Sequence, residues 1–394
     1  MAIDLLSSNP AIADHSLVAL DASRPLRREP YEPERTRASA FIKKFDDSSV
    51  FYDVFRDHTG RHVYLIGPMA LNLEPLLAQM IVTGVNSGQA AKPKVFHAIQ
   101  MLIVRVTLPA SDTELFLRLG DQEWIVPIQP NRSDALARDR IIFAINKDNL
   151  LEWIADWARF YVREHGATAV VIYDNGSTQY SMADLSAALA GVEGLKKFLI
   201  IDWPFRYGMR DVGFIGHRFG EGWARFAQPP MFTHLFRKYG MAARSILSVD
   251  IDELVISRTR QSIFKSVERS LFGLRRFNRL WVLNMRGADG VPRHADYVIR
   301  KKGTAAKDRG KKWAVAPGRA FLASWRAQLW THQVRGWLNL SGSSPEFFGY
   351  HFRGISHGWN YDRTDPGAFD PAIHVRDRLL AKALADNFPD RSQP

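Results

Sequence analysis

The sequence of 394 residues contains no cysteine, which excludes disulfides, thiolate metal sites and cysteine nucleophiles. Long apolar runs are also missing. The longest, such as Ala169–Tyr173 and Phe198–Ile201, have the length of a β-strand, so no membrane-spanning helix is expected. Met1–Pro10 lacks the basic and apolar regions of a secretory signal, so a cytoplasmic location is expected.

Acidic residues are outnumbered, with 41 Asp and Glu against 53 Lys and Arg, so the net charge is +12. Such a charge attracts polyanions, whether nucleic acid, an anionic lipid surface or a nucleotide diphosphate, and does not choose among them. The content of 46% hydrophobic and 24% charged residues excludes a disordered chain and predicts a folded protein with a sizeable core.

The composition changes along the chain and predicts four parts. Residues 1–40 are charged and interrupted by proline, which favours a disordered or extended tail. Residues 41–138 contain short apolar or alternating runs separated by turn formers, which predict a small β-sandwich-like accessory module. The expected strands there are Val50–Phe55, His62–Ile66, Val95–Thr107, Glu114–Leu119 and Glu123–Ile128. Residues 139–365 form the expected main domain, and residues 366–394 a C-terminal helix and tail.

From Arg140 onward, strands alternate with helices. The expected strands are Ile141–Ile145, Ala169–Tyr173, Phe198–Ile201 and Ile246–Val249. The expected helices are Asn149–Glu164, capped by Asp148 or Asn149, then Tyr180–Leu189 and Met231–Tyr239. This alternation predicts an α/β fold with a parallel sheet covered by helices on both faces. Ligands of such sheets bind beyond the carboxyl ends of the strands.

The residues at those carboxyl ends are Asn146, Asp174, Asp202 and Asp250. Three of the four are acidic in a protein that is basic overall. Asp174 opens an Asp-Asn-Gly turn, and its carboxylate is a candidate acceptor for hydrogen bonds from a base or ribose.

Asp250 and Asp252 follow the last of these strands two residues apart. In an extended chain they point the same way, and together they offer oxygen ligands to a hard divalent cation. The alternative is a solvated acidic turn. A phosphatase with an aspartate nucleophile is set aside, because Leu254 stands where such enzymes have Thr or Val.

The run FAINKDNLLEWIADW, TAVVIYDNGST, FLIIDWP, FAQPPMFTHLF and ILSVDIDE resembles glycosyltransferase family 92, within the nucleotide-diphospho-sugar transferase (GT-A) fold. The resemblance covers about residues 140–360. It implies a Rossmann-like, mostly parallel sheet, with Asp174, Asn175 and Asp202 in the nucleotide-sugar pocket. It also implies that Asp250 and Asp252 hold Mn²⁺ or Mg²⁺ against the diphosphate.

Three further elements downstream are similar to the family. Lys312 is expected to pair with phosphate and His332 to add a metal ligand, against the alternatives of a solvated basic loop and a surface histidine. His351 and Arg353 are expected to face the diphosphate or the acceptor, or else to pack the last element onto the domain. A carboxylate base must deprotonate the acceptor hydroxyl, and the candidates are Glu346, which is preferred, and Asp289.

Together these features predict a metal-dependent inverting glycosyltransferase that transfers a sugar, galactose being a candidate, from a nucleotide-sugar to a glycan or lipid-linked acceptor. The favoured donor is a UDP-sugar, the expected setting is cell-surface polysaccharide synthesis, and peripheral contact with an anionic membrane is possible. The alternative is a basic protein that binds nucleic acid or another polyanion without catalysis. Nucleic acid is disfavoured because no known nucleic-acid-binding motif is present. A non-catalytic transferase fold is a third, weaker alternative.

Overall fold

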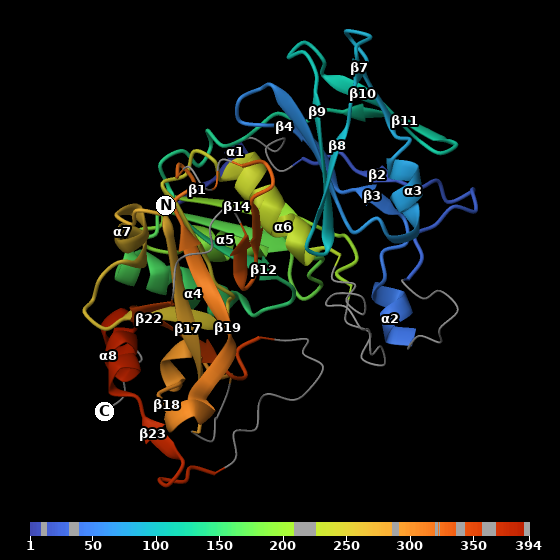
Figure 1. The fold of residues 1–394 in the computed structure, drawn as a ribbon. Helices are drawn as coiled ribbons and strands as arrows, with labels where there is room; N and C mark the ends of the chain where they lie inside the picture. The colour runs from blue at the N-terminus through green and yellow to red at the C-terminus, as the bar shows by residue number, and fades with distance from the viewer. Residues whose placement is uncertain are drawn as a thin grey trace.

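The computed structural model shows a mixed α/β protein in which a large central β-sheet is accompanied, within the described residues, by two four-stranded and three two-stranded sheets (Figure 1). The structure describes residues 1–8, 14–30, 39–208, 226–285, 291–319, 322, 324–335, 343–356 and 368–389. Within these ranges, no helix is both long enough and apolar enough to cross a membrane.

The central sheet has nine strands in the order β1-β14-β13-β12-β15-β19-β17-β22-β16. It runs parallel from β1 to β15, whereas β19 and β16 are antiparallel to their neighbours. The expectation of an α/β fold with a large, mostly parallel sheet is therefore confirmed. The strand bounds are β1 (Ile3–Asp4), β12 (Arg140–Asn146), β13 (Ala169–Asp174), β14 (Lys197–Asp202), β15 (Ser245–Ser248), β16 (Glu253–Ser257), β17 (Leu274–Val282), β19 (Lys307–Val315) and β22 (Ser343–Phe352).

Helices pack on both faces of the central sheet. They are α4 (Leu151–Phe160), α5 (Met182–Ala190), α6 (Gln228–His234), α7 (Ile263–Glu268) and α8 (Arg378–Asn387). In β12, Ile142 and Ala144 pack in the same core as α4 and α5, whereas Ile141 and Phe143 pack in the core that contains α6. Because both faces of the strand are buried, its sequence is a continuous apolar run instead of an alternating one.

The strand order reverses between β12 and β15, because the chain adds β13 and β14 on one side of β12 and then β15 on the other. The register places Asn146, Asp174 and Asp202 side by side at the carboxyl ends, and Phe143 opposite Ser248. A parallel sheet opens a crevice for ligands at such a reversal. The acidic turn after β15 lies at this point.

The N-terminal part forms two antiparallel four-stranded sheets that share one hydrophobic core. One sheet comprises β4 (Asp53–Arg56), β5 (His62–Gly67), β9 (Met101–Thr107) and β8 (Lys94–Ala98). The other comprises β11 (Gln122–Pro127), β10 (Glu114–Leu119), β6 (Ile81–Gly84) and β7 (Ala90–Ala91). The first sheet also packs on α6, where the ring centroids of Phe55 and His234 are 5.4 Å apart and Thr233 Oγ1 donates to Met101 Sδ over 3.3 Å.

Short elements complete the described fold. They are α1 (Leu5–Ser8), β2 (Val18–Ala19), α2 (Ser39–Lys44), β3 (Ser49–Phe51), η2 (Leu71–Leu73), α3 (Glu74–Leu77), the π-helices η3 (Tyr161–His165) and η4 (Leu235–Tyr239), η5 (His294–Asp296), β18 (Ile299–Lys301), η6 (Gly303–Ala306), β20 (Gln328–Trp330), β21 (Gln333–Arg335) and β23 (His374–Arg376).

The described parts of residues 1–40 make contacts that a disordered or extended tail would not make. Ile3–Asp4 adds a parallel strand to β14, and Val18–Ala19 pairs with β3. Arg28 is buried, and its guanidinium donates to the carbonyls of Met69 and Asp46. These contacts are made with residues far along the chain, which local composition does not reveal.

Two local expectations are also corrected. Val95–Thr107 is a hairpin of two strands, because Gln100 adopts a φ of 55° and turns the chain. Asp148 does not cap α4. Its carboxylate instead accepts hydrogen bonds from the backbone N–H groups of Thr178 and Gln179, at 2.6 and 3.0 Å. The start of α4 therefore has no side-chain cap.

Candidate active site at the carboxyl edge of the sheet

The acidic segment after β15 is a tight turn and not an extended strand end. The N–H of Glu253 donates to the carbonyl of Asp250, and the N–H of Asp250 donates to Glu253 Oε2, both over 3.0 Å. Asp250 and Asp252 therefore have different partners, which corrects the expectation that their side chains point the same way.

Lys312 reaches this turn from β19, the neighbour of β15. Its Nζ lies 2.7 Å from Asp250 Oδ2 and 3.2 Å from Glu253 Oε2. Although burial lowers the pKa of Lys312, the two carboxylates raise it above its usual value. For Glu253 the two effects have the opposite sign. Burial raises the pKa of Glu253, but the Lys312 and Arg279 charges hold it far below the ordinary range. Lys312 is fully buried and neutralises the acidic turn, instead of presenting its charge outward to a phosphate as expected.

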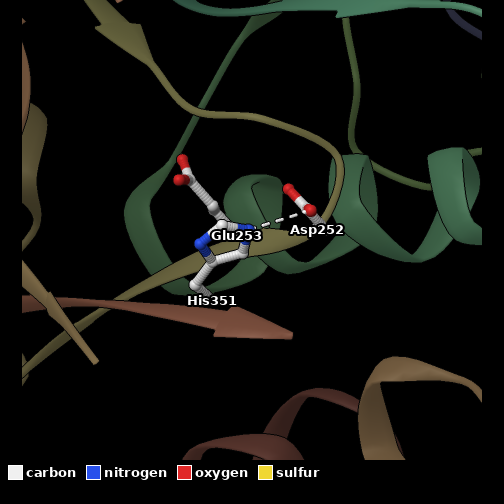
Figure 2. A group of neighbouring side chains, drawn as sticks. All are labelled: Asp252, Glu253 and His351. Atoms are coloured by element: carbon white, nitrogen blue, oxygen red, sulfur yellow. Dashed lines mark hydrogen bonds and ion pairs between the residues drawn. The ribbon is translucent and has the colours of Figure 1, made fainter. Parts of the chain in front are cut away.

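His351 joins the second aspartate of the turn to a carboxylate of β19. Its Nε2 lies 3.0 Å from Asp252 Oδ2 (Figure 2). Its Nδ1 lies 2.7 Å from Asp308 Oδ2. The Trp281 ring stacks on the imidazole at a centroid distance of 3.9 Å. Burial lowers the pKa of His351, but the Asp252 and Asp308 carboxylates raise it to about 9.

Arg279 of β17 completes the network. Its guanidinium pairs with Glu253 and lies 2.8 Å from Asp308 Oδ2, while its Nε donates to the carbonyl of Gly310 over 3.1 Å. A Cβ on Gly310 would lie 2.1 Å from Arg279 Nη2. The absence of a side chain there lets the guanidinium occupy its position between the two acids.

His332 is held apart from the two aspartates. Its Nδ1 lies 3.1 Å from the carbonyl of Lys311, and its ring lies beside Gly310. Burial, together with the Lys312 and Arg279 charges, lowers the pKa of His332 to about 4. Within the described chain, the residues that converge as possible metal ligands are Asp252, Glu253 and His351, so His332 and Asp250 lie outside that group.

The donor chemistry of this group fits a divalent metal. Each of the three residues offers one ligand atom, and these atoms all lie within 4.8 Å of one another. Imidazole with carboxylates suits ions such as Mn²⁺. The oxygens of Glu253 already face Lys312, Arg279 and the N–H of Asp250, so Asp252 and His351 are the better ligands. With a metal at His351 Nε2, the hydrogen bond from Nδ1 to Asp308 would orient the ring, as carboxylates do for metal-bound histidines.

The neighbouring strand ends form a second polar cluster. Asp174 is buried and accepts hydrogen bonds from Asn146 Nδ2 at 2.7 Å, from Ser177 Oγ at 2.6 Å and from the Ser177 N–H at 2.8 Å. Asn146 Nδ2 also donates to the Tyr180 hydroxyl. Through these hydrogen bonds, the Asp174 carboxylate fixes the conformation of the loop after β13.

Two of the other predicted nucleotide residues, Asn175 and Asp202, lie beside this cluster, and Arg353 lies elsewhere on the sheet. Asn175 is buried, and its Nδ2 donates to the carbonyls of Trp203 and Phe205. Asp202 is exposed at the end of β14, where partial burial and the nearby Asp174 raise its pKa. Arg353 lies two residues after His351, and its N–H donates to the carbonyl of Val282 at the end of β17.

Glu346, the preferred candidate base, is not brought to the acidic turn. Glu346 Oε1 accepts hydrogen bonds from the N–H and Oγ1 of Thr259, both over 2.8 Å, and from Ser257 Oγ. It lies on β22 five residues before His351, which is about 16 Å along a strand. The other candidate, Asp289, lies outside the described residues.

Sequence reasoning missed Arg279 and Asp308 and did not give His351 a metal-binding role. One pattern could have indicated Asp308: Asp308, Gly310 and Lys312 alternate along one strand, so they share a face. Nothing local points to Arg279, which lies in an arginine-rich strand among residues of similar type.

No protein-family model matches the chain, and no curated protein matches it. Among solved structures, the chain is similar to an active-site mutant of the glycosyltransferase LgtC, with 16% identity over 48% of this chain and 59% of that chain and a TM-score of 0.23. It is also similar to the glycosyltransferase TarS of S. aureus, with 13% identity over 45% of this chain and 47% of that chain and a TM-score of 0.24. The alignments span about half of each of these proteins. Membership of family 92 stays a prediction.

Proposed function

We propose that the protein is a metal-dependent inverting glycosyltransferase, which transfers a sugar from a nucleotide-sugar to a hydroxyl group of a glycan or lipid-linked acceptor. The observation that carries this proposal is the Asp252–His351 pair in the acidic turn that follows β15, on the same carboxyl edge of the sheet as the polar strand ends Asn146, Asp174 and Asp202. A ligand lying across this edge would contact both groups at once.

In this proposal, Asp252 and His351 hold Mn²⁺ or Mg²⁺, with Asp250 beside them. The metal supplies positive charge against the diphosphate leaving group. Lys312 and Arg279 keep Glu253 and Asp308 ionised, so the turn retains its shape when His351 gives up its proton to become a ligand. Lys312 therefore contributes to the site by stabilising the acidic turn.

The nucleotide would lie over β13 and β14. Because Asp174 is already committed to Asn146 and Ser177, the exposed Asp202 carboxylate is the better acceptor for a ribose hydroxyl or a base N–H. Asn175 fixes the loop beneath by bonding the Trp203 and Phe205 carbonyls. The preferred donor is a UDP-sugar, with galactose as the candidate sugar.

The catalytic base is proposed to be Asp289 in place of Glu346. Glu346 is held in hydrogen bonds to Ser257 and Thr259. Burial raises the pKa of Glu346, but these bonds outweigh it and hold the pKa below the usual value. A base for a hydroxyl must lie within hydrogen-bond reach of that hydroxyl, which would bind near the donor diphosphate. Asp289→Asn should therefore abolish transfer, while Glu346→Gln should retain it.

A thermal-shift titration with UDP, GDP and CMP, each with and without Mn²⁺, tests the proposal. A ligand present at about 100 times its Kd stabilises the native state by about 2.7 kcal/mol, which is readily seen as a melting shift. We expect one nucleotide to shift the melting temperature, and only in the presence of metal. Asp252→Asn should remove this shift, whereas Glu346→Gln, on β22 beside the last residue of β16, should keep it.

The absence of a nucleotide shift in the wild-type protein would contradict the proposal. Salt-sensitive binding of single-stranded DNA in that case would favour the alternative of a polyanion-binding protein. If the nucleotide raised the melting temperature equally with and without metal, nucleotide binding would be supported and the metal would be removed from the proposal.

A further inference from the structure

One exposed loop combines apolar side chains with surrounding cations. Residues Ala368–Ile373 precede β23 and are all exposed, with Phe369 and Ile373 each at 50%. The only acid in the loop is Asp370, whose carboxylate accepts a hydrogen bond from the N–H of Ala372. The Phe369 ring lies 5.9 Å from the His374 ring, so the loop conformation is held from within.

Basic side chains flank this loop. The two-stranded sheet of β18 and β23 pairs Lys301 with His374 and Ile299 with Arg376, and both Lys301 and Arg376 are exposed. Lys302 is also exposed, and its Nζ donates to the carbonyl of Pro371 over 2.7 Å. Three cations therefore surround a loop with a single acid.

The loop extends from the edge of the sheet that carries the candidate active site. A β-bridge between Leu283 and Ile299 joins β18 to the carboxyl end of β17, where Trp281 lies opposite His351. In Figure 1, β18 and β23 form the bottom of the molecule, far from the two N-terminal sheets.

We propose that the β18–β23 sheet and the Ala368–Ile373 loop dock on an anionic lipid bilayer, with the active-site edge toward the membrane. Phe369 and Ile373 enter the interfacial region, while Lys301, Lys302 and Arg376 contact lipid phosphates. Neither charge nor apolar area alone gives stable anchoring, and this loop offers both. Nucleic acid would pair with the cations and stack a base on Phe369, but it gains little from an isoleucine, a proline and two alanines.

Vesicle cosedimentation of the full chain tests this docking, and it needs no substrate or turnover. It therefore stands apart from the proposed transferase activity. We expect binding to phosphatidylglycerol-containing vesicles and far weaker binding to pure phosphatidylcholine, and raising NaCl from about 0.1 M to about 1 M should weaken it. Phe369→Ser with Ile373→Ser should weaken binding by about tenfold or more, since apolar contacts are lost without a change of charge.

The chain offers a matched control. Leu271 and Phe272 are exposed at 81% and 41% and adjoin Arg269, but they precede β17 and so lie at its opposite end. Leu271→Ser with Phe272→Ser should leave vesicle binding within about twofold of wild type. Lys301→Gln with Arg376→Gln should reduce binding and its dependence on salt.

Three outcomes would overturn the proposal. The first is wild-type protein that does not bind anionic vesicles. The second is loss of binding in the Leu271 and Phe272 pair but not in the Phe369 and Ile373 pair. The third is a Phe369 and Ile373 variant that binds vesicles like wild type while the lysine and arginine changes weaken vesicle and single-stranded DNA binding alike, which would identify a general polyanion patch.

Discussion

Lys312 shows how one buried ammonium can determine the shape of a site. It lies between Asp250 and Glu253, and its side chain has no exposed surface, whereas that of Asp250 is 43% exposed. Removing one member of a buried ion pair leaves the partner charge without compensation, which costs more than the pair itself contributes.

We therefore expect Lys312→Met to lower the free energy of unfolding by about 3–5 kcal/mol, because Glu253 stays buried with Arg279 as its remaining cation. Urea unfolding of the purified variant measures this loss. Adding Glu253→Gln to Lys312→Met should recover part of it, since the two residues are in contact. Equal and additive losses would show that the pair is not coupled.

Gly310 is a second residue that determines the arrangement of the site, because its neighbours occupy the space that a side chain would need. A Cβ there would collide with Arg279 Nη2 at 2.1 Å and with His332 Cε1 at 2.7 Å. The guanidinium cannot simply swing away, because Glu253 and Asp308 hold it.

Gly310→Ala should accordingly destabilise the protein by about 1–3 kcal/mol and reduce metal-dependent nucleotide binding. Gly318→Ala is the control, since no atom lies within 4 Å of its ideal Cβ position. Calorimetric melting of both variants distinguishes local crowding from a general cost of alanine on this part of the chain. A Gly310→Ala protein as stable as wild type would mean that the Arg279 contacts are dispensable.

At the scale of elements, the loop before α5 caps its helix with a side chain, whereas the loop before α4 does not. Ser181 caps α5 in a capping box, with its hydroxyl accepting from the Asp184 N–H and the Asp184 carboxylate accepting from the Ser181 N–H. Asp148 before α4 instead bonds the Thr178 and Gln179 backbone. The hydrogen bonds of Asp148 connect the end of β12 to the loop after β13. Helix α4 therefore lacks a side-chain cap, but the two loops at the edge of the candidate site are held together.

Ser181→Ala should cost about 1 kcal/mol of stability, because the backbone N–H of Asp184 in the first turn of α5 loses its acceptor. Ser181→Thr retains a hydroxyl and should stay within a few tenths of a kcal/mol of wild type. Guanidinium denaturation curves would measure both. An alanine variant as stable as the threonine variant would indicate that water replaces the cap.

At the scale of the whole molecule, the N-terminal sheets are joined to the central sheet through buried charges. Asp53 of β4 accepts hydrogen bonds from His234 Nε2 and Lys238 Nζ, both over 2.8 Å, and from the Ser16 N–H. The Tyr173 hydroxyl of β13 bonds the other nitrogen of His234. Two regions of the chain thus share one polar cluster inside the core.

This cluster predicts a dependence of stability on pH. Burial, opposed by Asp53, lowers the pKa of His234 to about 4, below the usual value near 6.5. The unfolded chain then binds the proton more readily, so stability falls from about pH 6.5 toward pH 4, by about 1 kcal/mol per pH unit for this histidine. His351 acts in the opposite sense, because its pKa of about 9 makes its contribution decline as pH rises from 6.5 to 9.

Urea unfolding measured across this range in the absence of metal should show maximal stability near neutral pH. His234→Gln should reduce the loss on the acid side, although it also lowers stability at every pH. A stability that is flat from pH 7 to pH 5 would contradict the buried neutral state of His234.

The sequence by itself determined the alternation of strands and helices from Arg140 onward, because buried strands and amphipathic helices differ in apolar period over short windows. It also placed Asp174, Asp202 and Asp250 at one edge, since carboxyl ends of parallel strands lie together.

Only the tertiary structure decided which side chains meet at that edge. Asp308, Arg279 and His351 come from three different strands of the sheet and join the acidic turn through β-pairing between distant segments. Glu346 resembles a base in its local sequence but lies several residues along β22 from the turn. Composition and spacing show which charged groups the chain contains. Which of them form ion pairs depends on distances that are fixed only by the packing of the folded chain.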